Sequence, residues 1–529
     1  MAPEEIIYRP AVLGPAVLLA GYLLYLLYQL VFGGPQLPKL PIVGAREGDW
    51  FPLLQARWRN ALDFKAAVIE AETAFRNQTA LLPIAGSGGR DRVILPRSEI
   101  QFVTDQPDTV LSMHDEVVDS LQFQYTSVNA DLVDNPTHHH LITTTLTNQT
   151  GNLVPDVADE TEWSFNKHWG NDTAYREIGL YDTMTRVISG VTNRVFVGEP
   201  KCRDQELLRI SLRYAAQLPI TGQILRAVWP PIRPLVGFFL TIPLRITTSQ
   251  FESTLRHEIE ARVAAYDARQ RDPEKKSSEP EANDFLQWLI HQAKATGNPY
   301  MWKTSTLAGR ILLINFAAIH TSSFAITGAI LDLVASKQEY VDELREEIQS
   351  VLAEYGGQWN KRALAQMQKL DSVFRESARL NSFATVGLAR RVVAKDGITT
   401  PSGIKLPYGT TLIVPSYTIL HDDSIYPDAE EFKPFRFSEQ RSDEKVGYVK
   451  RAAKQFATTS TEYLAFGHGR NACPGRFFAA NELKLILAHV VMNYDFEITG
   501  KGSRPRNKWY GMVRVPPMQA TIRIRKRDI

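Results

Sequence analysis

The stretch from Ile311 to Leu331 constrains the fold more than any other part of this 529-residue chain. It contains no Lys, Arg, Asp or Glu and is long enough to cross a bilayer. Its polar side chains would remain unsatisfied in lipid, which favours a helix buried inside a protein domain. We expect this helix to begin at Thr304 or Ser305 and to run to about Ser336, roughly 50 Å, as the spine of one large domain. The polar side chains are Asn315, His320, Thr321, Ser322, Ser323 and Thr327.

A second uncharged stretch, residues 11–32, lies near the N-terminus. At about 1.5 Å per residue its helix would span roughly 33 Å, enough for the hydrocarbon core of a bilayer. A secretory signal peptide is the competing interpretation, but its apolar region would be shorter and its start positively charged. Glu4 and Glu5 precede this stretch instead. We therefore predict a retained single-pass transmembrane anchor in contact with membrane lipid.

The anchor divides the chain into four expected parts. Residues 1–10 form a short luminal N-terminus, 11–32 the transmembrane anchor, 33–49 a hinge rich in Pro and Gly, and 50–529 the main domain. Lys39 and Arg46 follow the anchor, and positive residues favour the cytosolic side of a membrane. We therefore place the main domain in the cytosol, which fits a chain with only two cysteines.

Composition narrows the possible functions. The 60 Lys and Arg residues nearly balance the 58 Asp and Glu residues, so the net charge of +2 gives no global electrostatic case for binding nucleic acid. Two cysteines exclude a disulfide scaffold and a Cys-rich zinc or iron–sulfur framework. A single cysteine can still act alone, as a nucleophile or as a metal ligand.

The order of elements predicts a mainly α fold with small β-sheets (α+β). Helical periodicity dominates residues 50–385, and short strands separated by turn residues follow. Gly86-Ser-Gly-Gly89 indicates a plain turn, because it lacks the spacing of a phosphate-binding loop. The polar stretch from Gln440 to Thr461 is expected to be a surface excursion. The other predicted helices are 337–354, 363–380 and 475–492, and the predicted strands are 81–83, 93–95, 386–393, 404–406, 411–415 and 512–524.

The segment from Phe466 to Gly475 places a cysteine, Cys473, among glycines. Gly469 and Gly475 relieve steric limits on both sides of it, so the backbone can turn tightly and approach a flat ligand. A helix that begins directly after it would direct a positive dipole end at the sulfur and favour the thiolate. A lone thiolate among exposed amides suits an axial ligand of haem iron. The other interpretation is a buried structural cysteine, which is the one we prefer for Cys202.

This segment resembles the haem-binding loop of the cytochrome P-450 family, FxxGxRxCxG, and is similar to the loops of its fungal microsomal members. The matching fixed positions are Phe466, Gly469, Cys473 and Gly475. The Arg position holds Asn471, and Arg470 stands one place early. In the family that Arg contacts a haem propionate, so the resemblance leaves this role to Arg470 or His468.

Two further segments resemble the family's ExxR motif and its PERF segment. Glu376 and Arg379 are three residues apart and can pair on one helix face. Pro434-Phe-Arg-Phe437 is similar to PERF, with Phe435 in place of the Glu. The resemblance implies that Arg436 completes a buried network with Glu376 and Arg379, in which the charges compensate one another. Such a network locks the fold and is not a catalytic group.

The segment from Ala317 to Ser322 resembles the AGxDTT oxygen-activation segment of the family. Thr321 takes the Thr position, where the family's hydroxyl helps to deliver protons, and the two alanines keep the helix slim where it crosses the haem. His320 stands at the acidic position. Two interpretations of His320 remain open: an imidazole that moves protons itself, or a satisfied core histidine.

Two basic segments carry weaker signals. His138-His-His140 resembles a metal-binding tract, but three consecutive helical side chains point in different directions, which favours a solvated run. The resemblance adds that His138 can reach a haem propionate. One of Arg390 and Arg391, at the start of a predicted strand, is also expected to face the haem edge.

The resemblance implies a haem-thiolate monooxygenase with the cytochrome P-450 fold, haem b as its cofactor, and Cys473 as the axial ligand of the iron. Such an enzyme hydroxylates, epoxidises or desaturates an apolar small molecule. We expect a terpenoid, meroterpenoid or alkaloid intermediate of fungal secondary metabolism. Segments expected to line the substrate pocket are the loop Ser112–Tyr125 and the strand start Thr385–Leu388.

Electrons are expected from a separate protein, because the residues that follow Cys473 leave no room for a flavin or nicotinamide domain. The resemblance implies NADPH–cytochrome P-450 reductase on the same membrane. We expect Arg470, Arg476 and Lys484 to form a basic docking face for it. The predicted localisation is the endoplasmic reticulum membrane, with the catalytic domain on the cytosolic side.

Two other functions remain open. The first is a haem-thiolate isomerase or dehydratase that needs no dioxygen, which the missing acid beside Thr321 favours mildly. The second is a non-catalytic haem carrier or sensor, which a well-formed oxygen-activation segment disfavours. Requirement for NADPH and dioxygen distinguishes the first from a monooxygenase, and substrate-dependent oxygen uptake distinguishes the second.

Overall fold

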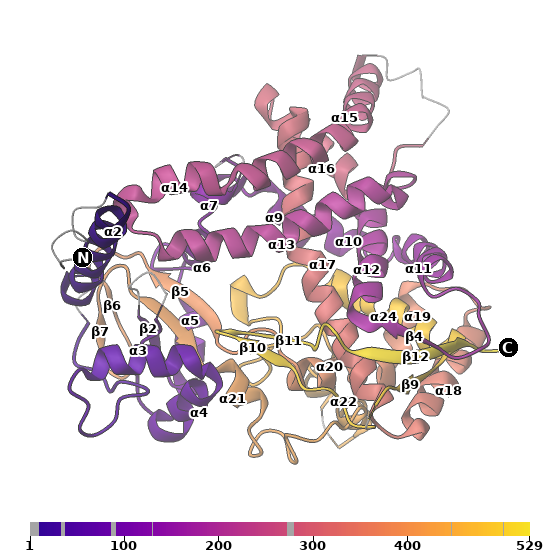
Figure 1. Ribbon diagram of the computed structural model, residues 1–529. Coiled ribbons are helices and arrows are strands. Elements are labelled where there is room, and N and C mark those ends of the chain that lie inside the picture. Colours follow the sequence, from indigo (N-terminus) through magenta and orange to yellow (C-terminus); the bar gives the residue numbers. More distant parts are fainter. Residues whose placement is uncertain are drawn as a thin grey trace. The chain divides into compact units, whose positions relative to one another are not determined.

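The computed structural model describes residues 10–32, 37–85, 91–127, 129, 131–271, 280–445, 447–500 and 502–528. It is mainly helical with small sheets, which confirms the predicted fold class (Figure 1). The chain divides into two compact units. Unit 1 comprises Met1–Gln122, Gln223–Gly237 and Val386–Pro415, and unit 2 comprises Phe123–Gly222, Phe238–Thr385 and Ser416–Ile529.

Unit 1 is built on a five-stranded sheet in the order β1-β2-β8-β5-β3. β2 and β8 pair in parallel and the other neighbours are antiparallel. The apolar strands β1, β2 and β8 are buried along their whole length, as expected for strands covered on both faces. The bounds are β1 (Ala80–Leu82), β2 (Arg92–Ile94), β3 (Leu111–Ser112), β5 (Gly387–Val392) and β8 (Thr411–Val414), with a hairpin of β6 (Ile398–Thr399) and β7 (Lys405–Leu406).

The predicted strands of unit 1 are present within about two residues of their expected bounds, whereas one predicted loop is wrong. The segment Ser112–Tyr125 is mostly helix, because α6 covers Met113–Leu121. The Ser112 hydroxyl accepts the N–H of Asp115 at 3.0 Å, and this cap starts the helix. The turn Gly86–Gly89 lies outside the described residues. The remaining helices of this unit are α2 (Pro10–Phe32), α3 (Pro52–Leu62), α4 (Phe64–Phe75) and α5 (Ile100–Asp105).

The predicted anchor segment is helical in α2. Its apolar stretch of described side chains runs over Gly14–Leu24 and is exposed, with Leu18 75% accessible. Among the residues searched, one helix passes a membrane test by length and composition, and it is α17 (Thr304–Val334). More than half of the apolar window of α17 is buried, so α17 is a core helix whose length and composition would also suit a membrane span.

Unit 2 holds most of the helices and the three-stranded antiparallel sheet β4-β12-β9. α13 (Gln205–Ala227) and α14 (Arg233–Leu240) contribute residues to both units. The main helices of unit 2 are α9 (Thr137–Leu141), α11 (Val154–His168), α12 (Leu180–Val197), α15 (Ile242–Arg271), α16 (Phe285–Ala295), α18 (Gln338–Glu354), α19 (Lys361–Gln366), α20 (Gln368–Leu380), α22 (Arg436–Ser442), α23 (Tyr448–Ala452) and α24 (Arg476–Asn493). Its strands are β4 (Arg176–Gly179), β9 (Tyr494–Ile498), β10 (Lys508–Tyr510), β11 (Val513–Val515) and β12 (Thr521–Lys526).

The long helix α17 is the spine of unit 2, as predicted. It packs against α12, α15, α20 and α24 (Figure 1). Its buried polar groups find partners inside the protein: Asn315 and Asn193 exchange two side-chain hydrogen bonds of 3.0 and 3.2 Å. The Ser323 hydroxyl donates to the Ile319 carbonyl at 2.7 Å. These contacts make a buried position tolerable for polar side chains that lipid would leave unsatisfied.

Three predictions for unit 2 need correction. The helix expected over 363–380 is two helices, α19 and α20, because Met367 leaves the helical conformation between them. The strand expected over 512–524 is two strands, β11 and β12. The polar segment 440–461 does not lie wholly on the surface: Phe456 is buried and donates its N–H to Asp371 at 2.8 Å. Arg375 binds the carbonyls of Gln455 and Thr458 and holds this end of the segment on α20.

Candidate functional site: the cysteine loop and the central helix

A tight loop presents Cys473 directly before α24. The Cys473 N–H donates to the Phe466 carbonyl at 2.8 Å and closes the loop. Gly467 and Gly469 have φ of 68° and 75°, the left-handed region that favours glycine, so the chain can turn here without a side-chain clash. The Phe466 ring packs on Phe456 with 5.0 Å between centroids. The loop is therefore fixed at its base and leaves the cysteine side chain exposed.

The electrostatics of Cys473 combine two opposing effects. The protein atoms packed around the Cys473 thiol desolvate it, and this raises its pKa. The backbone N–H groups of Gly475 and Arg476 and the charge of Arg476 lower the pKa of the thiol. Burial dominates, so the protein alone does not favour the thiolate as the sequence led us to expect. A bound iron supplies the missing charge, because a thiol that coordinates a metal is deprotonated outright. An accessible sulfur surrounded by backbone amides fits an axial haem ligand.

The middle of α17 carries an accessible face within unit 2. Ala317 and Thr321, one turn apart, are exposed, and His320 and Phe324 beside them are half-buried. Helical geometry places these four residues on one side of the helix. The Thr321 hydroxyl donates to the Ala317 carbonyl at 2.8 Å. A small side chain followed by a hydroxyl on this face suits a flat ligand and a polar reaction partner.

His320 has a partner on another helix. Its Nδ1 lies 2.9 Å from the hydroxyl of Tyr181, the second residue of α12. Its Nε2 is buried and has no hydrogen-bond partner among the described residues. Burial lowers the pKa of His320 and raises the pKa of Tyr181, so both side chains are neutral near pH 7.

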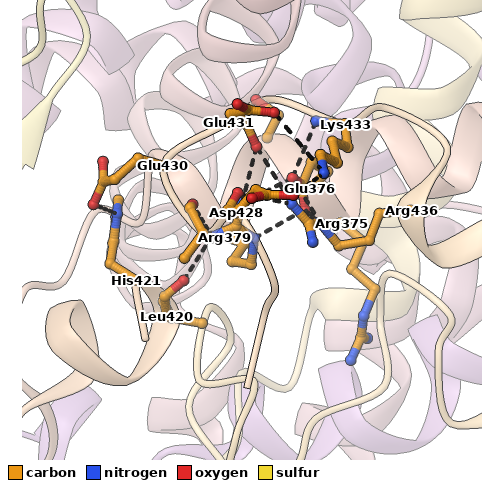
Figure 2. A network of polar contacts seen from close by, with 12 residues as sticks. Arg375, Glu376, Arg379, Leu420, His421, Asp428, Glu430, Glu431, Lys433 and Arg436 are labelled. Atoms are coloured by element: carbon orange, nitrogen blue, oxygen red, sulfur yellow. Dashed lines mark hydrogen bonds and ion pairs between the residues drawn. The ribbon is translucent and has the colours of Figure 1, made fainter. Parts of the chain in front are cut away.

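The structure brings Glu376, Arg379 and Arg436 into one buried network, and Figure 2 shows these groups converging on Glu376. Arg379 donates to Glu376 through Nε and Nη2 at 2.9 and 2.8 Å, a bidentate pair. Arg436 Nε donates to both carboxylate oxygens at 3.0 and 3.1 Å. The Lys433 N–H adds a bond of 3.2 Å. The carboxylate of Glu376 thus compensates two buried guanidinium groups.

The remaining donors of the two arginines bind carbonyls of the loop that follows residue 419. Arg379 Nη1 donates to Leu420 and Ala429 at 2.7 Å each. Arg436 Nη1 donates to Pro427 at 2.6 Å. The network therefore fastens this loop and the start of α22 to α20, which is the role of a structural lock.

The expected propionate ligands lie in different surroundings. Arg470 is exposed in a short turn, Gly469–Asn471, and forms no ion pair within the described part of the chain. His468 Nδ1 lies 3.0 Å from the Thr459 hydroxyl. His138 accepts a hydrogen bond of 3.2 Å at Nδ1 from the buried Arg310 of α17. Burial and the neighbouring Arg310 charge lower the pKa of His138 to about 3, so it is neutral.

One of the three residues expected to form the basic docking face for the reductase is not on the surface. Lys484 is buried, lies 3.6 Å from Asp371 and also binds the Leu364 carbonyl, so its assignment to an exposed face is wrong. Its position on the packed side of α24 explains the burial. Arg476 remains accessible and donates to the Cys473 carbonyl at 2.9 Å. In unit 1, Arg391 pairs with Glu116 and Asp119 at 3.1 and 2.9 Å.

Sequence reasoning missed two residues that adjoin the site. Tyr181 lies 139 residues before its partner His320, and no local pattern announces the pairing. Glu482 is buried in α24 and accepts hydrogen bonds from Thr192 at 2.7 Å and from Ser322 at 3.2 Å. An acidic residue inside the apolar stretch of a helix was the signal that could have identified Glu482. Cys202 is buried beside Glu160, and burial raises its pKa to about 12, in keeping with a structural role.

Comparison with known proteins identifies the family of the chain. A family model described as cytochrome P-450 matches residues 102–522. Cytochrome P-450 monooxygenase 71 of Postia placenta is 36% identical over 406 residues, 76% of this chain and 77% of that protein. Cytochrome P-450 monooxygenase astC of Aspergillus terreus is 30% identical over 530 residues, 98% of this chain and 96% of that protein. Cytochrome P-450 monooxygenase pbrC of Penicillium brasilianum is 31% identical over 512 residues, 95% of both. The chain therefore belongs to the cytochrome P-450 family and is a monooxygenase.

Proposed function

We propose that this protein is a membrane-anchored haem-thiolate monooxygenase that inserts one oxygen atom of dioxygen into an apolar small molecule. The observation that carries the proposal is the accessible Cys473 sulfur on a glycine loop at the start of α24. The accessible face of α17 with Thr321 belongs to the same compact unit. Haem b, held by the Cys473 thiolate, would supply the reductive cleavage of dioxygen and the transfer of oxygen to carbon.

The protein's own groups have separate tasks in this proposal. Cys473 ligates the iron, and the Phe466 carbonyl, which accepts its N–H, keeps the ligand loop from shifting. Ala317 leaves room beside the central helix, and the Thr321 hydroxyl moves a proton at Oγ1. Arg470 and His138 are the groups proposed for the haem propionates. Glu376, Arg379 and Arg436 hold the loop geometry and take no part in proton transfer.

The substrate is proposed as a terpenoid, meroterpenoid or alkaloid intermediate of fungal secondary metabolism. The support is that the relatives described above are fungal monooxygenases. Co-expression with a reductase and product profiling against a panel of such compounds tests this assignment. Oxidation of none of the three classes, in a preparation with an intact thiolate spectrum, contradicts it.

The anchor and the electron donor complete the proposal. The exposed apolar face of α2 supports a single-pass anchor in the endoplasmic reticulum membrane, with the catalytic part in the cytosol. Members of the family receive electrons from a redox partner, and we assign this role to NADPH–cytochrome P-450 reductase. The exposed Arg470 and the half-buried Arg476 near the cysteine loop are the proposed contacts for its acidic surface.

Two cysteine variants test the ligand assignment. Cys473→Ser should abolish the thiolate-type spectrum of the reduced CO complex, because an alkoxide or hydroxyl cannot replace the thiolate as electron donor. Cys202→Ser is the matched control, since Cys202 is buried away from the loop and should leave the spectrum unchanged. Survival of the spectrum in Cys473→Ser would overturn the assignment.

A second candidate is a haem-thiolate isomerase or dehydratase that needs no dioxygen. His320 at the acidic position of the oxygen-activation segment is the observation that favours it. Product formation without NADPH and dioxygen would support this candidate and overturn the monooxygenase. A haem carrier or sensor without catalysis is excluded if the substrate stimulates oxygen uptake by the reconstituted enzyme.

A further inference from the structure

We infer that Tyr181 is a positioning residue for proton delivery. Its hydroxyl fixes the ring of His320 and selects the tautomer that carries its proton on Nε2. His320 gives this proton to the oxygen site beside Thr321. The inference rests on the proposed monooxygenase function and deepens it. It starts from a hydrogen bond of 2.9 Å between Tyr181 on α12 and His320 Nδ1 on α17.

The ring contacts around the pair restrict its movement. Phe324, one helical turn after His320, stacks on the His320 ring with 6.2 Å between centroids and an interplanar angle of 27°. The same Phe324 ring stacks on Tyr181 at 5.6 Å and 24°. Phe383 stacks on Phe324 at 5.6 Å and 26°. Nearly parallel rings thus hold both members of the pair, which is how a proton-transfer group is pre-organised.

The tautomer of His320 follows from the hydrogen-bond donors and acceptors around its two ring nitrogens. A neutral imidazole has one N–H and one bare nitrogen. When the Tyr181 hydroxyl donates to Nδ1, the ring proton must sit on Nε2, which is buried and has no acceptor among the described residues. A buried donor without a partner is costly, so it marks a position where a partner arrives during function.

The position of His320 on α17 connects the pair to the site. His320 directly precedes Thr321 and lies on the same accessible side of the helix as Ala317. In the proposed step, His320 gives up its Nε2 proton and receives the Tyr181 hydroxyl proton at Nδ1. The half-buried Tyr181 then recovers a proton from solvent water. The net result is one proton moved from solvent to the site, with His320 left as its Nδ1–H tautomer, and no electron moves. Return of the Nδ1 proton to Tyr181 and protonation of Nε2, with Tyr181 releasing a proton to solvent, restores the starting state.

A set of four variants of the full-length holoenzyme tests the inference: Tyr181→Phe, His320→Gln, the double variant, and Tyr417→Phe as the matched control. The Tyr417 ring also lies against a histidine, His421, with 4.2 Å between centroids and an interplanar angle of 31°. The Nδ1 of His421 lies 2.8 Å from Glu430, so within the described part of the chain its partner is a carboxylate and not the Tyr417 hydroxyl. Both substitutions therefore remove the hydroxyl of a tyrosine whose ring lies near an imidazole, and only Tyr181→Phe removes a hydroxyl–imidazole bond.

Two readouts are needed. The first is the infrared C–O stretch of the reduced CO complex, which responds to hydrogen-bond donors near the ligand and requires no turnover. The second is the fraction of NADPH electrons recovered in product. Tyr181→Phe should shift the C–O stretch in the same direction as His320→Gln and lower the recovered fraction by about threefold to tenfold. The double variant should be no worse than His320→Gln alone, because the two residues act as one unit.

The outcomes separate this inference from the proposed function. Tyr181→Phe and Tyr417→Phe with the same C–O stretch and the same recovered fraction would overturn the role of Tyr181 and leave the monooxygenase intact. Additive losses in the double variant would also overturn it, because they indicate two independent structural effects. A wild-type protein without a thiolate-type CO spectrum would instead overturn the proposed function itself.

Discussion

The Ser322 hydroxyl donates a hydrogen bond of 3.2 Å to Oε2 of Glu482 and joins the central helix α17 to α24, the helix that begins after Cys473. The other carboxyl oxygen accepts from Thr192 on α12 at 2.7 Å. No cation compensates Glu482 among the described residues, and burial raises its pKa from 4.5 to about 7. Glu482 is therefore largely a neutral acid below its pKa of about 7, and it ties three helices together.

The first prediction concerns the pH dependence of stability that Glu482 creates. Its folded pKa lies above its unfolded value, so its contribution is fully present below pH 4.5 and is lost as pH rises to about 7. The difference corresponds to about 3 kcal/mol. Glu482→Gln cannot ionise, so its Tm relative to wild type should rise between pH 5 and 7.5, as measured by thermal unfolding monitored by circular dichroism.

The control for this experiment is Glu497→Gln, which alters an exposed glutamate on β9. It should follow the wild-type pH profile. Parallel Tm curves for Glu482→Gln and wild type across this pH range would show that Glu482 does not titrate as described.

The second prediction separates the buried lock from a surface ion pair in the same loop. Glu376→Ala leaves Arg379 and Arg436 buried without their carboxylate and should cost about 3–5 kcal/mol. Glu431→Gln removes a carboxylate that lies 3.8 Å from Lys433 and is mostly exposed, and it should cost about 0–1 kcal/mol. Urea unfolding measures both, and equal losses in the two variants would contradict the assignment of Glu376 as the central group.

The third prediction concerns Lys484, whose ammonium is buried against Asp371 and the Leu364 carbonyl. Lys484→Met removes one of two cations near the buried Asp371, the other being Arg441 at 3.3 Å, so it should lower Tm. It should leave the apparent KM for the reductase unchanged in the folded fraction. Arg476→Ala, in which an accessible cation is removed, should raise that KM instead. A raised KM in Lys484→Met at unaltered Tm would return this lysine to the docking face.

The fourth prediction concerns α2. Replacing Leu18, Leu19 and Leu23, all exposed, by glutamate should release the protein from the membrane pellet after carbonate extraction. The same three replacements by isoleucine keep the apolar surface and are the control. Retention of the glutamate variant in the pellet would show that another part of the chain integrates into the membrane.

Local patterns were sufficient for the elements whose burial the sequence itself encodes. The uncharged run of α17 and its polar exceptions predicted a buried spine, and the structure places Asn315 against Asn193 as that argument requires. The alternation and turn residues after residue 385 predicted β5, β7 and β8 to within about two residues, whereas the two-residue strands β3 and β6 of unit 1 were not predicted. In these cases the short-range spacing of residues and their packing in the folded protein favour the same secondary structure and the same buried face.

Contacts between distant segments could not be predicted in this way. Lys484 has the composition of a surface residue, and its burial depends on Asp371, more than a hundred residues earlier. The polar segment 440–461 is drawn into the core by Arg375 and Asp371 of α20, which no local pattern reveals. Tyr181 is another example, because the positioning role that we infer for it depends on a hydrogen bond to His320 on a different helix.

The composition of α17 has a consequence for how the chain is made. The helix is long and apolar enough to cross a membrane, although more than half of its apolar window is buried in the protein. In the proposed membrane-anchored enzyme, the polar groups of Asn315, Ser322 and Thr327 raise the free energy of inserting this helix into lipid. Their leucine replacements would favour a second insertion and place the cysteine loop in the lumen. The residues that pack the centre of the enzyme would therefore also protect the proposed membrane topology.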